Sequence, residues 1–164
     1  MLRAFLAGLD AAEDGTGPLV LELTTFGGDA DLARRMASDV QLFRERTGRR
    51  TIFFGRTTIY SSGVTVMGAF PRSDRWLTRD ATLLVHGRSL ARTLELSGAL
   101  ALERPKVLAV LSEIDAGLAL EREDFERVIE GSRIALSEVL ERAPSNWYLR
   151  APEALARGLV AGLV

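Results

Sequence analysis

The chain lacks cysteine altogether and contains a single histidine, His86, and these shortages exclude several kinds of chemistry. Without cysteine there is no disulfide, no thiol nucleophile and no thiolate ligand for a metal. One imidazole cannot build a zinc site that requires several. The absence of cysteine also favours a reducing compartment. We therefore expect a cytoplasmic protein whose chemistry uses neither a metal nor another cofactor.

A strong charge of one sign and a long apolar run are also missing. The 21 Lys and Arg residues nearly balance the 22 Asp and Glu residues, which leaves a net charge of −1. This balance gives no indication of nucleic acid or of an anionic membrane as a partner. No apolar run approaches the roughly 18 residues that a membrane-spanning helix needs, and no signal peptide is recognisable. The 164 residues suit a single domain, 1–164, with a core of its own.

Short apolar runs alternate with amphipathic segments along the chain. The runs at 19–23, 50–55, 75–78 and 81–86 predict strands, and the last residues, LVAGLV, predict a closing strand. Helices are expected over 2–12, from Asp29 or Asp31 to Gly48, over 62–70, and within APEALARGLV, whereas 90–143 is expected to be helical with a break near Pro105. Nearly continuous apolar strands separated by helices indicate an α/β fold with a mostly parallel sheet.

Three polar clusters follow predicted strands, where sites gather in parallel α/β folds. They are the Gly27-Gly28 turn, the pair Ser61 and Ser62, and His86. Each also has a purely structural interpretation: a tight turn, a helix cap and a buried imidazole, respectively. Their shared position at strand ends is what favours a functional interpretation.

These residue types together suit nucleophilic catalysis by serine. A serine hydroxyl attacks a carbonyl only when a base removes its proton, and His86 is the one histidine that could do so. A helix N-terminus favours the transient anion on the serine. Backbone amides of a Gly-Gly turn could stabilise a tetrahedral oxyanion, because glycine lets the substrate approach closely.

Three segments together resemble the proteolytic subunit of the Clp protease, a family of serine peptidases. They are LVLELTTFGGDADLARRMASDV, YSSGVTVMGAFPRSDRWLTRDATLLVHGR and NWYLRAPEALARGLVAGLV. The resemblance covers about residues 17–88 and 144–164. It implies the spiral of βα units that this family shares with crotonase-type folds, with a long helical segment after the histidine strand.

The resemblance also implies roles for individual residues. Ser61 aligns with the nucleophile, His86 with the base and Asn146 with the acidic third member of the triad. The amides of Gly28 and Ser62 align with the oxyanion hole. Ser62 remains an alternative nucleophile, because Ser62-Gly63 resembles the Ser-Gly of the signal-peptide-peptidase-like relatives.

Several positions depart from the family pattern. Phe26 replaces a proline, Ile59 and Tyr60 replace small residues before the nucleophile, and Ala161 replaces a closing aspartate. Asn146 can orient the imidazole, but it carries no charge to stabilise the imidazolium; in trypsin, an Asp-to-Asn change in the triad costs about 10⁴ in rate. Another carboxylate could take this role instead, and the candidates are Asp80, Asp115 and Asp124.

The resemblance therefore predicts a serine-type endopeptidase that acts on peptides or proteins. The alternative is a weak or inactive relative that works by assembly or partner binding, and a crotonase-type enzyme acting on acyl-CoA is a third hypothesis. The region after His86 includes the segment that forms a helical handle between two rings in Clp-type subunits, so we expect a homo-oligomer, although the same leucines would also suit packing within one chain. The chain begins at the family's first helix, so we do not expect an ATPase partner.

Two further groups are expected to have structural roles only. Arg72, Arg75 and Arg79 predict a solvated basic face. Trp147 and Tyr148 predict wedges in the core, with a platform for substrate as the alternative.

Overall fold

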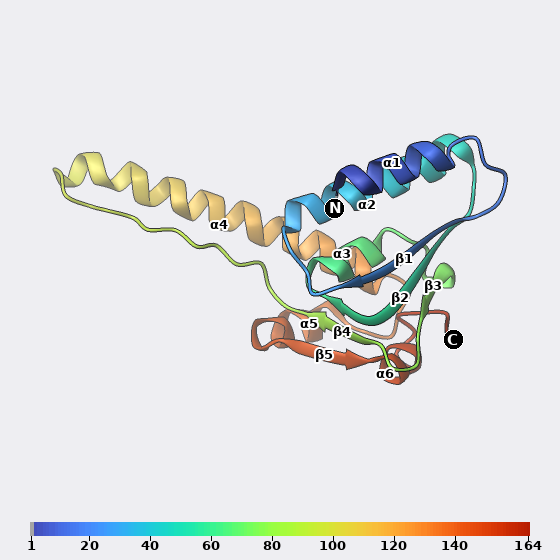
Figure 1. Cartoon of the computed structure of the whole chain (residues 1–164). Helices are drawn as coiled ribbons and strands as arrows, with labels where there is room; N and C mark the ends of the chain where they lie inside the picture. Colours follow the sequence, from blue (N-terminus) through green and yellow to red (C-terminus); the bar gives the residue numbers. More distant parts are fainter. Residues whose placement is uncertain (1) are drawn as a thin grey trace.

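The computed structural model describes residues 2–164, which form a curled sheet with helices around it and a long projecting arm (Figure 1). The elements in chain order are α1 (Leu2–Ala12), β1 (Leu19–Thr25), α2 (Ala30–Thr47), β2 (Thr51–Tyr60), α3 (Ser62–Gly68), η1 (Arg72–Asp74), β3 (Arg75–Leu77), β4 (Thr82–Val85), α4 (Leu100–Ile129), α5 (Leu136–Arg142), η2 (Ala143–Ser145), β5 (Trp147–Arg150), α6 (Ala151–Ala156) and β6 (Gly162–Leu163).

The long strand β2 organises the sheet, because three other strands pair with it. β1 runs parallel to it, β3 pairs with its residues 53–55, and β4 pairs with its residues 58–60. The register against β1 shifts between Leu23 and Thr25, where Thr57 of β2 has a φ of 55°. This irregularity bends β2, so that its first half pairs with β3 and its second half with β4.

The sheet is mostly parallel, as predicted, but one strand pair is antiparallel. β4 and β5 pair with Val85 opposite Trp147 and Thr82 opposite Arg150. The sequence pattern does not predict β5, because the strand's alternation of buried and exposed residues spans only four positions. β5 returns the chain alongside the strand that ends just before His86.

Helix α2 begins and ends at the residues that the sequence predicts. The Asp29 side chain accepts hydrogen bonds from the amides of Asp31 and Leu32, at 2.8 and 2.9 Å, and so caps the first turn. Of the two candidates, Asp29 is therefore the cap. Gly48 closes the helix in the left-handed conformation, with a φ of 65°.

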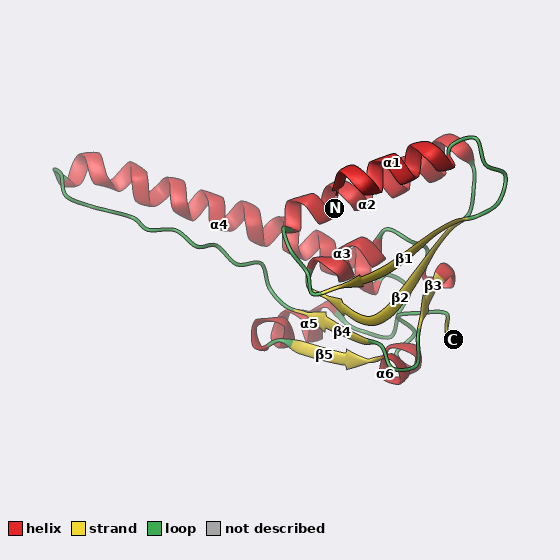
Figure 2. Cartoon of the chain, viewed as in Figure 1, coloured by secondary structure: helices red, strands yellow, loops and turns green. Residues whose placement is uncertain are grey.

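The prediction of helix throughout 90–143 is wrong in two places. Residues 89–97 form no helix but run as an extended strap beside α4. Residues 130–135 form a non-helical loop between α4 and α5 (Figure 2). Arg92 of the strap forms an ion pair with Glu113 of α4 at 2.6 Å. A helix of nine residues would be only marginally stable in water, and residues 89–97 instead adopt an extended conformation that contacts α4.

Pro105 does not break α4, contrary to the prediction. It is the sixth residue of this helix, so only one backbone hydrogen bond, to a carbonyl of the first turn, is lost. The helix continues from Leu100 to Ile129. Its first part, together with the strap beside it, forms the arm that projects from the sheet (Figure 1). Among the described residues, no helix combines the length and hydropathy that crossing a membrane requires.

Arg75 lies inside the protein, so its assignment to a solvated basic face is wrong. It is 2% exposed, and its Nε and Nη1 donate to the carbonyls of Phe70 and Val128 at 2.9 and 2.6 Å. Its Nη2 lies 3.3 Å from the carbonyl oxygens of Gly68 and Arg127. One guanidinium therefore joins the C-terminal ends of α3 and α4. Burial lowers the pKa of Arg75 to about 10.

We predict that Arg75→Met will lower the free energy of unfolding by about 3 kcal/mol, because it leaves buried carbonyls without a donor. Urea unfolding followed by circular dichroism would measure the change. Arg79→Met removes an exposed arginine a few residues away and is the matched control, with an expected change within about 0.5 kcal/mol. Equal stability of the two variants would contradict the bridging role of Arg75.

Candidate active site

Ser61 occupies a strained corner between β2 and α3. Its φ of 56° and ψ of −119° lie outside the regions that non-glycine residues normally adopt. Its amide donates to the Leu84 carbonyl at 2.8 Å, which ties the corner to β4. The side chain makes no capping hydrogen bond to α3. The helix-cap interpretation of Ser61 is therefore wrong.

Ser62, the alternative nucleophile, is the first residue of α3. It is 9% exposed, whereas Ser61 is only partly buried. The corner thus presents the two hydroxyls differently, with Ser61 on the bend and Ser62 within the first helical turn.

The Gly27-Gly28 turn packs directly against Ser61. A Cβ placed on Gly27, which has a φ of 103°, would lie 2.7 Å from Ser61 Cβ and 3.2 Å from its Oγ. Every other residue type at position 27 would collide with the serine. The Gly27 amide donates to Thr25 Oγ1 at 3.0 Å, which fixes the turn in this position. The first glycine therefore permits a close approach as well as a turn.

A cavity of about 300 Å³ opens beside this corner. Its lining includes Gly28, Ser61, Ser62 and His86, so four of the five predicted site residues meet at one place. The topology explains the meeting, because β2 and β4 are paired in parallel and both end at this edge of the sheet. Segments far apart in the sequence are brought together here.

His86 follows β4 and is partly buried. Its Nδ1 lies 2.6 Å from the carbonyl oxygen of Gly87. Because a carbonyl only accepts hydrogen bonds, this contact assigns the proton to Nδ1 and leaves a lone pair on Nε2. Within the described residues no hydrogen bond joins the ring to either serine hydroxyl. The ring is therefore in the tautomer that a general base needs, in the same cavity as the serines.

Asn146, the fifth predicted residue, does not line this cavity. It is exposed, has a φ of 59°, and precedes β5. Val85 lies opposite Trp147 in the antiparallel pair, so the next positions along the two strands are His86 and Asn146. The asparagine is thus close to the histidine in the register of the sheet, but the Nδ1 partner is the Gly87 carbonyl. Its proposed catalytic role stays a prediction.

The two backbone amides that the resemblance assigns to an oxyanion hole, those of Gly28 and Ser62, belong to residues that line the cavity. The Ser62 amide opens α3, where the first amides have no carbonyl partner within the helix. The Gly28 amide makes no hydrogen bond with any of residues 2–164, and a φ of 156° makes this backbone unfavourable for other residue types.

The chain just after His86 is held by two helices. The Glu121 carboxylate of α4 accepts a hydrogen bond from the Arg88 amide, and a Cβ on Gly87 would lie 3.2 Å from Glu121 Oε2. The Arg88 side chain in turn forms an ion pair with Asp31 of α2 at 2.9 Å. These contacts fix the segment whose carbonyl orients the imidazole. Nothing in the sequence pattern pointed to Glu121 as a site residue.

Asp124 is the one alternative acid that lines the cavity. It is 6% exposed, and one of its oxygens lies 2.5 Å from Arg34 Nη1 of α2. Burial raises its pKa, and the positive charge of Arg34 opposes this effect. The ion-pair partners of Asp124 within residues 2–164 are arginines, and His86 is not among them. Asp80 and Asp115 are exposed and do not line the cavity.

Three aromatic side chains form a row at the C-terminal end of β2. Phe26 packs edge-on against Tyr60 with ring centres 6.0 Å apart, and Tyr60 packs in the same way against Tyr148 at 5.8 Å. Phe26 is 80% exposed and Tyr148 54% exposed, so the prediction of a core wedge is wrong for Tyr148. It is confirmed for Trp147, which is buried with the guanidiniums of Arg142 and Arg157 over its ring.

No protein-family model matches the chain, and no curated protein matches it significantly. The resemblance to the Clp-protease proteolytic subunit accordingly stays a prediction that rests on the three segments that carry it. The structure itself shows the α/β architecture with its mostly parallel, curled sheet.

Proposed function

We propose that the chain is a serine hydrolase that cleaves peptide bonds, with Ser61 as its nucleophile and His86 as its base. The observation that carries the proposal is the strained backbone of Ser61, whose hydroxyl makes no cap and which lines a cavity together with His86. Strained backbone persists where the surrounding structure maintains it, and such residues concentrate at active sites.

The reaction would proceed through an acyl-enzyme. Ser61 Oγ attacks the substrate carbonyl carbon while His86 Nε2 takes the hydroxyl proton. The amides of Gly28 and Ser62 stabilise the resulting oxyanion. The C–N bond then breaks, and the imidazolium passes its proton to the leaving amine. Water, activated by the same ring, attacks the acyl-enzyme and releases the acid and the serine.

The Gly87 carbonyl would serve as the acceptor that orients the imidazole. Its hydrogen bond from Nδ1 holds the ring in one tautomer, which is part of what a triad carboxylate does. It lacks the negative charge that would stabilise the imidazolium. Asn146 in the next position along the sheet adds no charge either, so this form of the site favours slow turnover.

The finer assignments belong to the same proposal. We infer that the curled sheet is a divergent form of the Clp-type spiral, that the substrate is a peptide or protein, and that the protein works in the cytoplasm. The proposed reaction uses only the chain's own residues, without metal or cofactor. The proposal includes no ATPase, nucleic acid or membrane partner.

We predict that a fluorophosphonate probe will label Ser61, because a serine activated by a base attacks phosphorus as it attacks a carbonyl. Ser61→Ala should abolish the labelling and lower hydrolysis of an activated ester by about 10³-fold or more. Ser62→Ala is the matched control and should keep the label. Mass spectrometry of the digested protein would locate the modified residue.

Two results of this experiment would contradict the assignment. A label on Ser62 that survives in Ser61→Ala would move the nucleophile by one residue. Absence of label from both serines in a folded protein, at any pH between neutral and mildly alkaline, would exclude the hydrolase.

We predict that Asn146→Asp will raise kcat/KM for an activated ester by about tenfold or more, because a carboxylate near His86 would stabilise the imidazolium. Steady-state kinetics of the variant and the unaltered protein would measure the change. Asn146→Ala is the control, since it removes the amide without adding charge. Equal rates for the aspartate and alanine variants would show that position 146 does not act on the ring.

Assembly is a second candidate function, and the projecting arm is the observation that favours it. Four apolar side chains of α4, each between 39% and 56% exposed, lie along the arm: Leu108, Leu111, Ile114 and Leu118. The strap adds the exposed Leu90, Leu94 and Leu96. Exposed apolar patches on a projecting element are typical of contacts between proteins. We propose that a second copy of the chain covers this arm.

We predict that the double variant Leu111→Glu, Leu118→Glu will be monomeric, because charges on one face of the arm would oppose burial in an interface. Sedimentation velocity should show the unaltered protein heavier than its 17.9 kDa chain. Leu42→Glu is the matched control, since Leu42 is 49% exposed but lies on α2. A monomeric unaltered protein would contradict assembly.

A further inference from the structure

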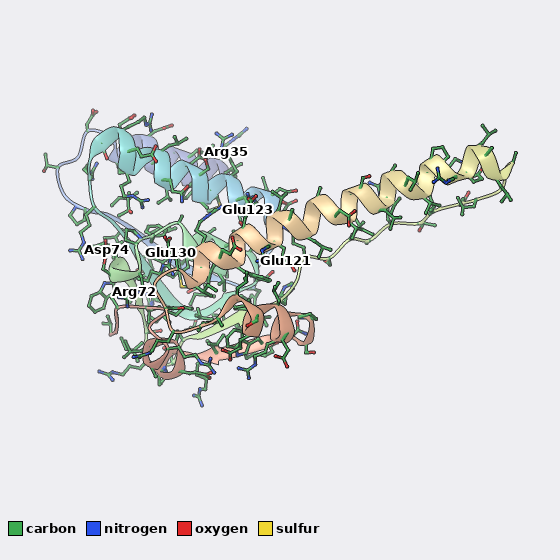
Figure 3. The ribbon with its side chains drawn as sticks, turned by 180° about the vertical axis from the view of Figure 1, so that it is seen from behind. Arg35, Arg72, Asp74, Glu121, Glu123 and Glu130 are labelled. Atoms are coloured by element: carbon green, nitrogen blue, oxygen red, sulfur yellow. The ribbon has the colours of Figure 1, made fainter. Side chains whose placement is uncertain are left out.

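A second cavity, of about 340 Å³, lies at the other end of α3 from the serines. Its walls come from α2, from the segment that joins α3 to η1, and from the C-terminal end of α4. Glu130 is the one acidic residue in its lining, which also holds four arginines: Arg44, Arg72, Arg75 and Arg127. Four positive charges and one negative charge leave a formal charge of +3. Figure 3 shows Arg72 and Glu130 close together at this end of α4.

Protein groups neutralise this charge only in part. Arg127 Nη1 lies 3.8 Å from Asp124, which is itself paired with Arg34 at 2.5 Å. No ion pair is formed by Arg44, Arg72 or Arg75 within the described residues. Burial is the main cause of the lowered Arg75 pKa; the negative charge of Glu130 opposes this lowering, and the positive charge of Arg72 adds to it.

Several N–H donors of these arginines remain for a ligand. A guanidinium has five N–H groups. Arg75 contacts four carbonyls with its own, so its role is structural. Arg72 makes a single long contact, 3.4 Å to the Gly158 carbonyl, and Arg44 engages only Nη1, with Ala69 and Thr51. Arg127 has no hydrogen bond from its side chain to residues 2–164.

We propose that this cavity binds a phosphate group. Converging guanidiniums with spare donors match the several acceptor oxygens and the double charge of a phosphate better than they match a single carboxylate. The volume exceeds what one phosphate group requires, so the cavity accommodates a diphosphate. Arg72, Arg127 and Arg44 supply the donors, whereas Glu130 and the C-terminal ends of α3 and α4, which favour cations, limit the affinity.

The proposal is independent of the hydrolase chemistry. The serines begin α3, whereas Gly68, Ala69 and Phe70 at its opposite end line the arginine cavity. No residue lines both cavities. Loss of phosphate binding would therefore leave the proposed function untouched, and the reverse also holds.

Calorimetric titration of the full chain with inorganic phosphate and with pyrophosphate, at constant ionic strength, tests the proposal. We expect both to bind and pyrophosphate to bind more tightly, because the cavity accepts two phosphate groups. Arg72→Gln should weaken pyrophosphate binding about tenfold or more, through loss of a charge-assisted hydrogen bond. Glu130→Gln should strengthen it severalfold, since repulsion is removed.

Arg35→Gln is the matched control, because Arg35 lies on α2 away from Arg72 (Figure 3) and pairs with Asp39 at 2.8 Å. Its affinity for pyrophosphate should equal that of the unaltered protein. Circular dichroism would confirm that each variant is folded. Failure of the folded, unaltered protein to bind either anion at millimolar concentration would overturn the proposal. Equal weakening by Arg35→Gln and Arg72→Gln would overturn it too, because attraction by overall charge would then explain the binding.

Discussion

The guanidinium of Arg75 fixes the two helices on which the rest of the molecule depends. It donates to carbonyls at the C-terminal ends of α3 and α4, where unpaired carbonyls and the helix dipoles favour a cation. The opposite end of α3 begins beside Ser61, and α4 carries Glu121 and Asp124 to the same cavity. This buried cation therefore links the helix that follows the serine corner to the helix that carries Glu121 and Asp124.

Much of this arrangement followed from local sequence pattern. The apolar runs predicted the parallel strands, and because β2 and β4 end at one edge, Ser61 and His86 meet there as expected. Asp29 and Gly48 delimit α2 through chemistry that acts within a few residues. Periodicity and capping are local, so they can be recognised without knowledge of the fold.

The features that escaped prediction depend on contacts between distant segments. The strap has leucines at spacings that suit a helix, yet it runs extended beside α4, with which Arg92 forms an ion pair. Arg75 is chemically like Arg79 in sequence, yet the carbonyls that surround it come from residues up to 53 positions away. Glu121 contacts the backbone after His86 across 33 positions. The hydrophobic periodicity of a sequence does not indicate contacts between such distant residues.

The partner of the imidazole has an implication for how this site can vary. The oxygen that faces Nδ1 belongs to the peptide backbone, and the amide of the following residue is itself held by Glu121. Replacing the side chain at another position cannot delete that oxygen. The alignment of the ring therefore rests on an acceptor that no side-chain substitution removes.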